Sequence, residues 1–541
     1  MVRVNTSIKG ITRYSPVSAH GRHLPRVLLV SPFKRIDVIK GVPSMGVHRI
    51  AQFLSGNGHA YADVVDSYEG FARIMEGRGP AKKYDIVGIS TYSGQHFRDA
   101  ANKIEFVRHY LGNVLLVTGG HGMKADHDLL FGCFKVDIAV TGPGELPMAD
   151  ICDNLSKPGS MLERFAGIRG ISINTGGRAY KTPPRILTQE DYESFIDSFD
   201  FTKLPIRPKD KDRLIEFEMS FSTHCPNVCV FCSASSFNKG EHRRVIYYPE
   251  EKILEKLNSF IKHHIKANST GRFRVMFNDD NLTVNRERFF RILEGVDEIR
   301  KRTGCEIEFE CLSRFECLTD ELLERAARLG VTSIAVGVES RVPEILQFLK
   351  PGADVRRSRG IEKKMLQYGI IPTEFFIVAP PVATVETILR TAEDMLEALK
   401  NGAIVRPFLL METYAGSPAM SMGFKVKSLR LKPKTFPNMK APYELPYVFR
   451  NTDKRVDRIV DEIERVFDAA FGAYQKMHPN KVGEEMFAVY SAMLVCSIFQ
   501  VLGIKDKRMK AAKETLKILE KDFMHYGKKL WKKKLPGYGT V

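Results

Sequence analysis

The stretch "THCPNVCVFCSASS" at residues 223–236 places three cysteines within eight positions, at Cys225, Cys229 and Cys232. It follows an apolar run, "LIEFEMSFST", that is typical of a buried β-strand. A structural zinc site needs a fourth ligand, and His224 and His242 are candidates, but no second cysteine pair follows. Three thiolates on one loop can instead ligate three irons of a [4Fe–4S] cluster and leave the fourth iron open. The spacing alone leaves both possibilities.

Five more apolar runs follow the cysteine loop, and helical patterns separate them. One helix is expected at "PEEKILEKLNSFIKHHI" and another at "TDELLERAARLG". Six strand–helix units in a row predict a partial barrel, whose functional face lies at the carboxyl ends of its strands. The five later strands are expected at 273–280, 306–314, 331–340, 370–381 and 404–414.

Several of these strands alternate charged and apolar residues. Glu306, Glu308 and Glu310 share one side of their strand, and Glu216 and Glu218 share one side of the first. The apolar sides are expected to pack on the helices, so the charged sides should face the barrel interior. Charges there are costly unless they are paired or bind something.

The first 155 residues also alternate short apolar runs with amphipathic stretches, which predicts a parallel sheet covered by helices on both faces. Small and polar residues follow three of the expected strands, and they include Ser90, Thr91, Gly119, Gly120 and the segment 142–145. Ligands of such sheets bind beyond the carboxyl ends of the strands. We therefore expect a ligand with a long tail there, because glycines let the backbone approach it closely.

Length and composition describe a folded protein of about two to four domains. The chain has 541 residues, 43% of them apolar and 27% charged, with nine cysteines and a net charge of +18. An odd number of scattered cysteines does not suggest an extracellular disulfide framework, and no apolar signal segment opens the chain. A cytoplasmic location is expected, with peripheral contact with an anionic membrane as an alternative.

The pattern divides the chain into four parts. Residues 1–156 form the first sheet, 157–212 a linker with a hairpin, 213–420 the barrel, and 421–541 a basic helical region. That last region holds 25 Lys and Arg against 13 Asp and Glu. Its charge suggests an acidic partner, an anionic membrane surface or a solvated helical face. Nucleic acid is disfavoured, because no nucleic-acid-binding motif accompanies the charge.

The stretch "CPNVCVFC" after a strand that opens a barrel resembles the radical S-adenosylmethionine (SAM) superfamily. Four later stretches resemble its cobalamin-associated branch in the same order, so the resemblance covers roughly residues 210–420. They are "FNDDNLT" (277–283), "SRFECLTDELLERAARLGVTSIAVGVES" (313–340), "FFIVAPP" (375–381) and "TYAGSPAM" (413–420). The resemblance implies an α/β fold with an N-terminal Rossmann-like cobalamin-binding domain, a partial (β/α)6 radical SAM barrel and a helical C-terminal region.

One departure from cobalamin proteins concerns the loop after the first strand, "SPFKRIDVIKGVPSMG" (31–46). It lacks the DxHxxG motif that supplies a histidine to cobalt in many cobalamin enzymes. Many members of this branch also lack that motif. The resemblance therefore implies cobalamin with its own base displaced and no protein histidine on cobalt.

The resemblance also implies roles for individual residues. The three cysteines would ligate a [4Fe–4S] cluster whose open iron chelates SAM. Phe231 would lie against the adenine of SAM, and Asp279, Arg314 and Glu339 would hold its ribose, amine or carboxylate. The residues implied for the cobalamin tail are Ser90, Thr91, Gly119, Gly120, Gly142 and Glu145. No residue that acts directly on the substrate is identified.

The leading hypothesis is a cobalamin-dependent radical SAM methyltransferase. Cleavage of SAM would give a 5′-deoxyadenosyl radical that activates an unactivated carbon, methylcobalamin would supply the methyl group, and a second SAM would remethylate the cobalamin. Alternatives are an anaerobic tetrapyrrole oxidative cyclase, a ring-contracting enzyme, a radical C–C coupling enzyme, or a non-catalytic cobalamin- or zinc-binding regulatory module. Expected partners are flavodoxin or ferredoxin as reductant and a lipid, tetrapyrrole or peptide as substrate, with the chain a monomer.

Overall fold

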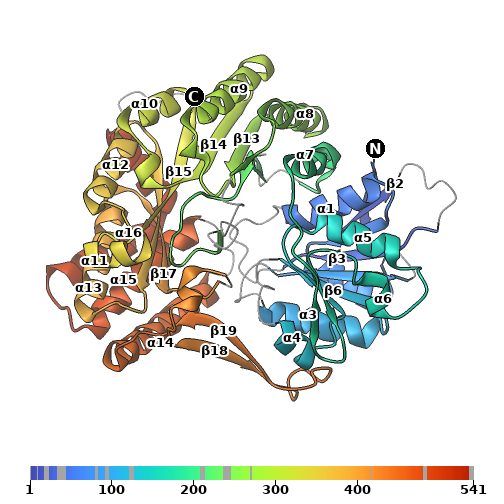
Figure 1. The fold of residues 1–541 in the computed structure, drawn as a ribbon. Helices are drawn as coiled ribbons and strands as arrows, with labels where there is room; N and C mark the ends of the chain where they lie inside the picture. Colours follow the sequence, from blue (N-terminus) through green and yellow to red (C-terminus); the bar gives the residue numbers. More distant parts are fainter. Residues whose placement is uncertain are drawn as a thin grey trace.

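The computed structural model of the chain describes residues 2–8, 10–16, 23–32, 44–79, 83–91, 97–120, 127–206, 214–234, 245–268, 271–414, 416–478 and 484–534. Figure 1 shows two lobes, the N-terminal sheet in blue and the barrel in green to orange. The predicted α/β fold class, with an N-terminal Rossmann-like sheet, a partial barrel and C-terminal helices, is confirmed. His242 and most of the loop 31–46 lie outside the described residues.

The N-terminal lobe is a nine-stranded sheet in the order β1-β2-β4-β3-β5-β6-β7-β8-β9. Its strands are β1 (Val2–Ile8), β2 (Ile11–Pro16), β3 (Arg26–Val30), β4 (Tyr61–Val65), β5 (Ile86–Ser90), β6 (Leu115–Gly119), β7 (Ile138–Val140), β8 (Ile171–Asn174) and β9 (Ala179–Lys181). Strands β4, β3, β5, β6 and β7 are parallel. Because β3 has β4 on one side and β5 on the other, the strand order reverses there, which is where such sheets bind ligands.

Helices cover both faces of this sheet, as the apolar strands predict. Val27 and Leu29 of β3 contribute to one core, and Leu28 and Val30 contribute to the core on the opposite face. Residues of α1 and α5 pack in the first core, and residues of α2 and α3 pack in the second. The helices of this lobe are α1 (Met45–Gly56), α2 (Tyr68–Met75), α3 (Phe97–Tyr110), α4 (His127–Cys133), α5 (Glu145–Asn154), α6 (Met161–Phe165) and α7 (Gln189–Ser198).

The sheet differs from the prediction at both edges. Strands β1 and β2 add an antiparallel pair beside β4, although no strand was expected in this segment. The hairpin expected between residues 157 and 212 is present as β8 and β9, but β8 pairs antiparallel with β7. The hairpin therefore belongs to the sheet and not to a free linker, since it satisfies backbone groups that the edge of β7 would leave unpaired.

The second lobe contains six parallel strands in the order β10-β13-β14-β15-β16-β17. These strands are β10 (Ile215–Met219), β13 (Arg272–Phe277), β14 (Glu306–Ser313), β15 (Val331–Glu339), β16 (Ile371–Ala379) and β17 (Ile404–Leu410). The helices that alternate with them are α8 (Glu250–Asn268), α9 (Arg286–Thr303), α10 (Asp320–Arg328), α11 (Pro343–Leu349), α12 (Val355–Gln367) and α13 (Val385–Asn401). The predicted partial barrel of six units is confirmed.

The charged side of the first three barrel strands is paired within the sheet. From Glu306 to Cys311 of β14, buried apolar residues alternate with exposed or half-buried glutamates, as predicted. Arg274 of β13 donates to Glu216 at 2.9 Å and to Glu308 at 2.7 Å, and it lies 3.8 Å from Glu310. One guanidinium therefore faces three carboxylates and balances part of their charge.

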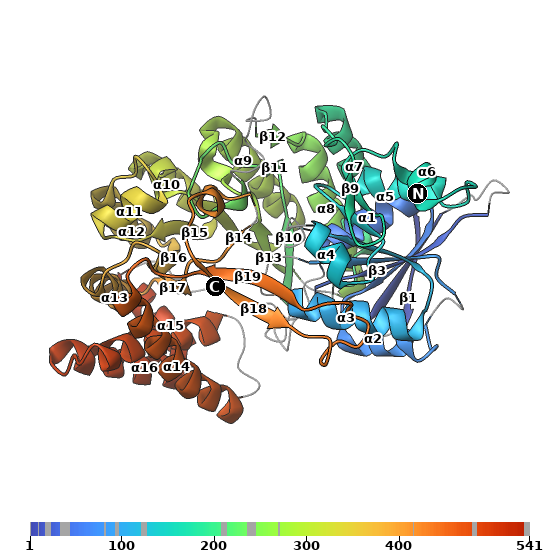
Figure 2. The same cartoon turned by 60° about the horizontal axis from the view of Figure 1, so that its bottom comes forward.

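The region after residue 420 begins differently from the prediction of an all-helical segment. A hairpin of β18 (Val426–Leu431) and β19 (Tyr443–Phe449) comes first, and Figure 2 shows it reaching from the barrel to the N-terminal lobe. The predicted helices then follow as α14 (Lys454–Met477), α15 (Glu484–Val501) and α16 (Lys507–Lys534). Among the described helices, none is long and apolar enough to cross a membrane.

Candidate metal and cofactor site

The cysteine loop lies at the carboxyl end of the barrel sheet, after β10 and the short strand β11 (Ser222–Thr223). Cys225 and Cys229 are buried and Cys232 is half-buried. Burial raises the pKa of the Cys229 thiol and raises the pKa of the Cys232 thiol to about 12. Because the thiolate is the form that binds metal, uptake of a cluster would release protons here.

Main-chain hydrogen bonds fix the loop between two distant segments. The Val230 N–H donates to the Leu349 carbonyl at 3.0 Å, and the Val230 carbonyl accepts from the Ala419 N–H at 2.9 Å. The loop is thus held by the end of α11 and by the "TYAGSPAM" segment. Phe231 is half-buried and packs against the core, and its contact with adenine stays a prediction.

The described residues do not form a binding site for a single metal ion. No group of three His, Cys, Asp or Glu side chains lies close enough together there to hold one ion. In a [4Fe–4S] cluster each cysteine binds its own iron, so the thiols surround the cluster instead of meeting at one ion. The donor set of three cysteines on one loop fits the cluster better than zinc.

Asp279 follows β13 and anchors the strand that leads into the cysteines. Its carboxylate accepts from the Phe221 N–H at 3.1 Å and from the Ser222 hydroxyl. Burial raises the pKa of Asp279 to about 6, although these hydrogen bonds oppose the increase. The structure gives Asp279 a positioning role, and its contact with SAM stays a prediction.

Arg314 follows β14 and contacts the cysteine loop directly. Its Nη1 donates to the sulfur of Cys229 at 2.8 Å, and its Nη2 donates to Glu316 at 2.6 Å. The positive charge of Arg314 lowers the pKa of Cys229 and partly offsets the effect of burial. The guanidinium therefore favours the thiolate that a cluster needs.

Glu339 ends β15 in a left-handed backbone conformation, with φ of 61°. Its carboxylate folds back over Gly337, where an added Cβ would lie 2.5 Å from the Oε1 atom. Burial raises the pKa of Glu339 to about 7, while the charges of Lys350 and Arg314 oppose the increase. A buried carboxylate in a strained turn beside the cysteine loop indicates a functional position. Its contact with SAM stays a prediction.

The six residues predicted for the cobalamin tail lie at the carboxyl ends of β5, β6 and β7. Ser90 pairs with Gly119, and the Thr91 N–H donates to the Gly119 carbonyl at 2.9 Å. Gly120 has φ of +96°, and a Cβ there would lie 2.3 Å from the Thr91 carbonyl oxygen. Gly142 has the same φ after β7. The backbone at Gly120 and Gly142 therefore favours glycine, and the close approach of a ligand stays a prediction.

Several buried polar atoms at this edge have no hydrogen-bond partner among the residues that the structure describes. They are the hydroxyls of Thr91 and Thr118 and the Oε2 atom of Glu145. Buried polar groups are normally satisfied, so such atoms indicate a ligand or water that completes them. This donor set fits a cofactor with a polar tail.

A chain of contacts connects the two candidate sites. Glu145, the first residue of α5, forms an ion pair with Arg49 of α1. Arg49 also lies near Tyr248, where its positive charge lowers the pKa of the phenol against the effect of burial, and the Tyr248 N–H donates to the Phe221 carbonyl at 2.8 Å. The N–H of Phe221 in turn donates to Asp279. The edge of the N-terminal sheet and the approach to the cysteines are therefore neighbours in space.

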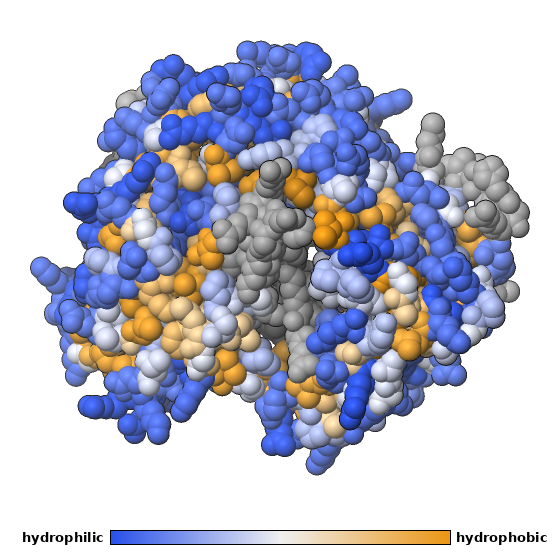
Figure 3. All heavy atoms as spheres, in the orientation of Figure 1, coloured by the Kyte–Doolittle hydropathy of each residue, from blue (hydrophilic) through white to orange (hydrophobic). Residues whose placement is uncertain are grey.

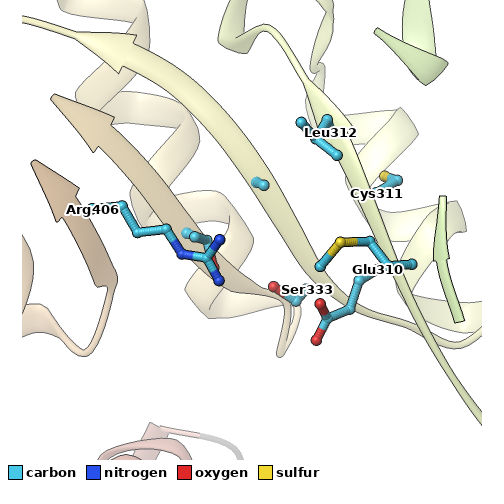
Figure 4. A pocket seen from close by; sticks show the side chains of 8 residues that line it. Glu310, Cys311, Leu312, Ser333 and Arg406 are labelled. Carbon is cyan, nitrogen blue, oxygen red and sulfur yellow. The ribbon is translucent and has the colours of Figure 1, made fainter. Parts of the chain in front are cut away.

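A pocket opens inside the barrel. Figure 4 shows Glu310 of β14 and Arg406 of β17 projecting toward it from different strands. The guanidinium of Arg406 lies 5.0 Å from the ring centre of Phe487, in α15. The pocket is lined by Met276, Glu310, Cys311, Leu312, Ser333, Ala335, Thr373 and Arg406.

Comparison with protein families characterises the barrel region of the chain. Residues 219–395 match the family model of the radical SAM superfamily. This range contains the cysteine loop together with Asp279, Arg314 and Glu339. The chain therefore carries a radical SAM domain and is an enzyme.

Three curated relatives carry the name of methyltransferase or methylase. An uncharacterized methyltransferase of Pyrococcus horikoshii is 29% identical over 60% of this chain. A bacteriochlorophyllide d C-12(1)-methyltransferase of Chlorobaculum tepidum is 25% identical over 24%, and a hopanoid C-2 methylase of Rhodopseudomonas palustris is 26% identical over 28%. The matches span 66%, 26% and 28% of those proteins, less than two thirds of each.

Two solved structures share the fold. The radical SAM methyltransferase TsrM of Kitasatospora setae, with cobalamin and a [4Fe–4S] cluster bound, has a TM-score of 0.60 at 14% identity, over 91% of this chain and 100% of that one. The cobalamin-dependent radical SAM enzyme OxsB, with aqua-cobalamin bound, has a TM-score of 0.62 at 14% identity, over 94% and 80%. Both likenesses extend across the two lobes.

Sequence reasoning missed four residues that the structure places at these sites. Arg49 lies in an amphipathic helix and Thr118 inside an apolar strand, where nothing in the local pattern marks them. Nothing in the sequence distinguishes Glu316 from the many other acidic residues. Lys350 has a signal in the sequence, because it directly follows the apolar run "ILQFL" and precedes "PG". A lysine at such a position is expected to be exposed, but the structure buries it.

Proposed function

We propose that this chain is a cobalamin-dependent radical SAM methyltransferase that transfers a methyl group to an unactivated carbon. The observation that carries the proposal is the contact chain from Glu145 through Arg49 and Tyr248 to the strand before the cysteines. This contact chain brings two sites close together. One is the cysteine loop, which suits a cluster, and the other is the edge of the N-terminal sheet, which suits a cofactor with a long polar tail. A substrate between them would meet both cofactors.

Each cofactor has a set of residues that would hold it. Cys225, Cys229 and Cys232 would ligate the [4Fe–4S] cluster. Phe231, Asp279, Arg314 and Glu339 would surround SAM, and the cobalamin tail would lie on Ser90, Thr91, Gly119, Gly120, Gly142 and Glu145. When bound, the cluster with SAM would supply a 5′-deoxyadenosyl radical, and methylcobalamin would supply the methyl group.

The chain's own residues orient these reagents. Asp279 holds the approach to the cysteine loop through the Phe221 N–H and the Ser222 hydroxyl, and Val230 connects the loop to α11 and to the segment after β17. Arg274 holds two glutamates of the barrel interior by hydrogen bonds, lies 3.8 Å from a third, and balances part of their charge. These contacts favour a fixed geometry between the radical source and the substrate.

Two observations support carbon methylation of a large, partly apolar substrate. Two of the relatives are named for methylation at numbered carbon positions, of a bacteriochlorophyllide and of a hopanoid. Figure 3 shows hydrophobic side chains gathered around the centre of the view, where the two lobes meet. We therefore favour a lipid or a tetrapyrrole over a peptide as the substrate.

The experiment uses a reaction that does not require the substrate. The chain is reconstituted anaerobically with iron, sulfide and reduced cobalamin, and then given SAM with a CD3 methyl group. We expect about four irons per chain, CD3-labelled cobalamin and an equal amount of S-adenosylhomocysteine. Bound cobalamin that stays unmethylated, while SAM is cleaved to 5′-deoxyadenosine, would instead favour a cyclase, ring contraction or C–C coupling.

A matched pair of variants separates the two cofactor sites. Replacing the three cysteines with alanine should remove the iron and leave cobalamin binding intact. The single variant Cys496→Ala, which removes a half-buried thiol from α15, should change neither. Zinc in place of iron, at one ion per chain, would support the regulatory module.

A further inference from the structure

A buried lysine, Lys350, lies directly behind the cysteine loop. Only 2% of its side chain is exposed, and it follows Leu349, whose carbonyl accepts from the loop. Its ammonium donates to the Gly337 carbonyl at 2.5 Å and lies 5.0 Å from the ring centre of Phe315. Because a buried ammonium is costly unless it is paired, this placement needs an explanation beyond packing.

The ammonium is the first member of a row of three charges. Lys350 lies 3.8 Å from the Oε2 atom of Glu316, and the other oxygen of Glu316 accepts from Arg314 at 2.6 Å. The second arm of Arg314 donates to the sulfur of Cys229 at 2.8 Å. The row therefore runs from the end of α11 to one of the three cysteine sulfurs.

The row places a positively charged N–H donor beside that sulfur. Arg314 and Lys350 carry two positive charges and Glu316 one negative charge, while the buried carboxylate of Glu339, which both cations face, adds a second negative charge when it is ionised. An N–H donor and a positive charge at a ligating sulfur stabilise the more negative, reduced form of an iron–sulfur cluster. Glu316 orients the guanidinium, and Lys350 offsets the charge of Glu316 that would otherwise cancel the effect.

We propose that Arg314, held by Glu316 and Lys350, raises the reduction potential of the cluster that Cys229 would ligate. This inference rests on the proposed function, because it requires that cluster. The step concerned transfers one electron from an added reductant, such as dithionite, to the oxidised cluster, and no covalent bond forms or breaks. Arg314 would lower the free energy of that reduced state, while Glu316 and Lys350 are positioning residues.

The test measures the cluster without substrate and without SAM. Wild type, Arg314→Gln and Lys350→Met are reconstituted, and the signal of the reduced [4Fe–4S] cluster is followed by EPR during titration with dithionite and mediators. At a fixed potential we expect the ratio of reduced to oxidised cluster to fall about tenfold in Arg314→Gln, which corresponds to about 59 mV for one electron. In Lys350→Met this ratio should fall by a smaller factor, and Lys350→Arg should keep the wild-type ratio.

The control is Arg300→Gln, which removes a half-buried guanidinium near the opposite end of β14, where Arg300 donates to the Ile307 carbonyl at 3.2 Å. It should leave the potential unchanged. Equal potentials in wild type, Arg314→Gln and Lys350→Met would overturn the inference. If Arg314→Gln takes up no iron, Lys350→Met decides alone, and an unchanged potential there overturns it. A wild-type chain without a [4Fe–4S] cluster would contradict the proposed function itself.

Discussion

Gly120 and Gly142 share one backbone conformation but have different surroundings. Both have φ of +96°, a region that costs a residue with a side chain about 1–2 kcal/mol. A Cβ at Gly120 would meet the Thr91 carbonyl oxygen at 2.3 Å, whereas a Cβ at Gly142 would meet no atom of the described residues within 4 Å. The pair therefore separates backbone strain from a steric clash.

We expect Gly120→Ala to lower the free energy of unfolding by more than Gly142→Ala does. Gly142→Ala should cost only the strain of about 1–2 kcal/mol, while Gly120→Ala must also push Thr91 out of the strand end. Urea denaturation of both variants measures the difference, and cobalamin titration shows whether the shifted edge still binds. Equal losses of stability in the two variants would contradict the prediction and mean that Thr91 can shift without cost to make room for the added Cβ at residue 120.

His264 gives the fold a dependence on pH outside the candidate site. Burial lowers the pKa of His264 to about 4 from its ordinary 6.5, and its ring packs 4.4 Å from Phe260. The folded chain therefore resists protonation at a pH where the unfolded chain accepts the proton. This contribution is fully present above pH 6.5 and is lost as the pH falls toward 4.

The variant His264→Phe should remove this dependence. Between pH 6.5 and 4 the unfolding free energy of wild type should fall by up to about 3 kcal/mol more than that of the variant. Thermal unfolding at a series of pH values provides the measurement. His263→Phe, at the exposed neighbouring position, should keep most of the wild-type slope, because burial lowers the pKa of His264 more than the charge of His263 does. If both variants keep it, another group carries the acid sensitivity.

At the scale of elements, the hairpin β18–β19 closes the core of a lobe to which it does not belong in sequence. Leu431, Phe436, Met439, Tyr443 and Leu445 pack with residues of α2, α3 and α4. Main-chain bonds support the contact, because the Lys440 N–H donates to the Cys133 carbonyl at 2.6 Å. The hairpin therefore fastens the barrel to the N-terminal lobe.

Tyr443 is the residue on which this attachment most depends. It is 1% exposed, and its ring lies 5.0 Å from that of Phe97 and 5.5 Å from that of Phe134. We expect Tyr443→Ala to cost about 3–5 kcal/mol and to expose the hairpin loop to limited proteolysis. Tyr447→Ala, at a half-buried position of the same strand, should cost clearly less and leave the cleavage pattern unchanged. Equal proteolysis of both would show that the hairpin is held elsewhere.

Local pattern was enough for some elements and not for others. The barrel strands and their order could be predicted because apolar runs, alternation and helix signals recur over each unit. The hairpin could not, because its apolar residues contact a partner about three hundred residues earlier, as the 309-residue separation of Cys133 and Pro442 shows. The same holds at the site. Cys229 belongs to a motif that the sequence shows directly, whereas the role of Lys350 depends on its contact with Glu316, which lies in a different strand–helix unit.

At the scale of the whole molecule, one continuous core connects the lobes. Phe53 of α1 packs edge-on against Phe195 of α7 with 5.5 Å between ring centres. Gln52 exchanges hydrogen bonds with the main chain of Asp200, and Lys256 of α8 donates to the Phe199 carbonyl at 2.7 Å. The segment between the lobes is therefore packed on both sides and is not a flexible hinge.

This continuity predicts that the two lobes unfold together. Differential scanning calorimetry of the wild type should show one transition, because separating the lobes would expose apolar surface on both. In Tyr443→Ala, where the second attachment is weakened, the transition should broaden or split. Two well-separated transitions in the wild type would contradict the prediction and indicate independent domains.

The hairpin also has a consequence for biosynthesis. The ribosome synthesises the N-terminal lobe long before it reaches Tyr443. Until then Phe97 and Phe134 lack the Tyr443 ring that packs on them in the folded chain. At about 5–20 residues per second, the 309 residues between Cys133 and Pro442 take roughly 15–60 seconds to synthesise. During that time the nascent lobe presents an apolar surface to the cell, and we expect it to be a client of chaperones until the hairpin emerges.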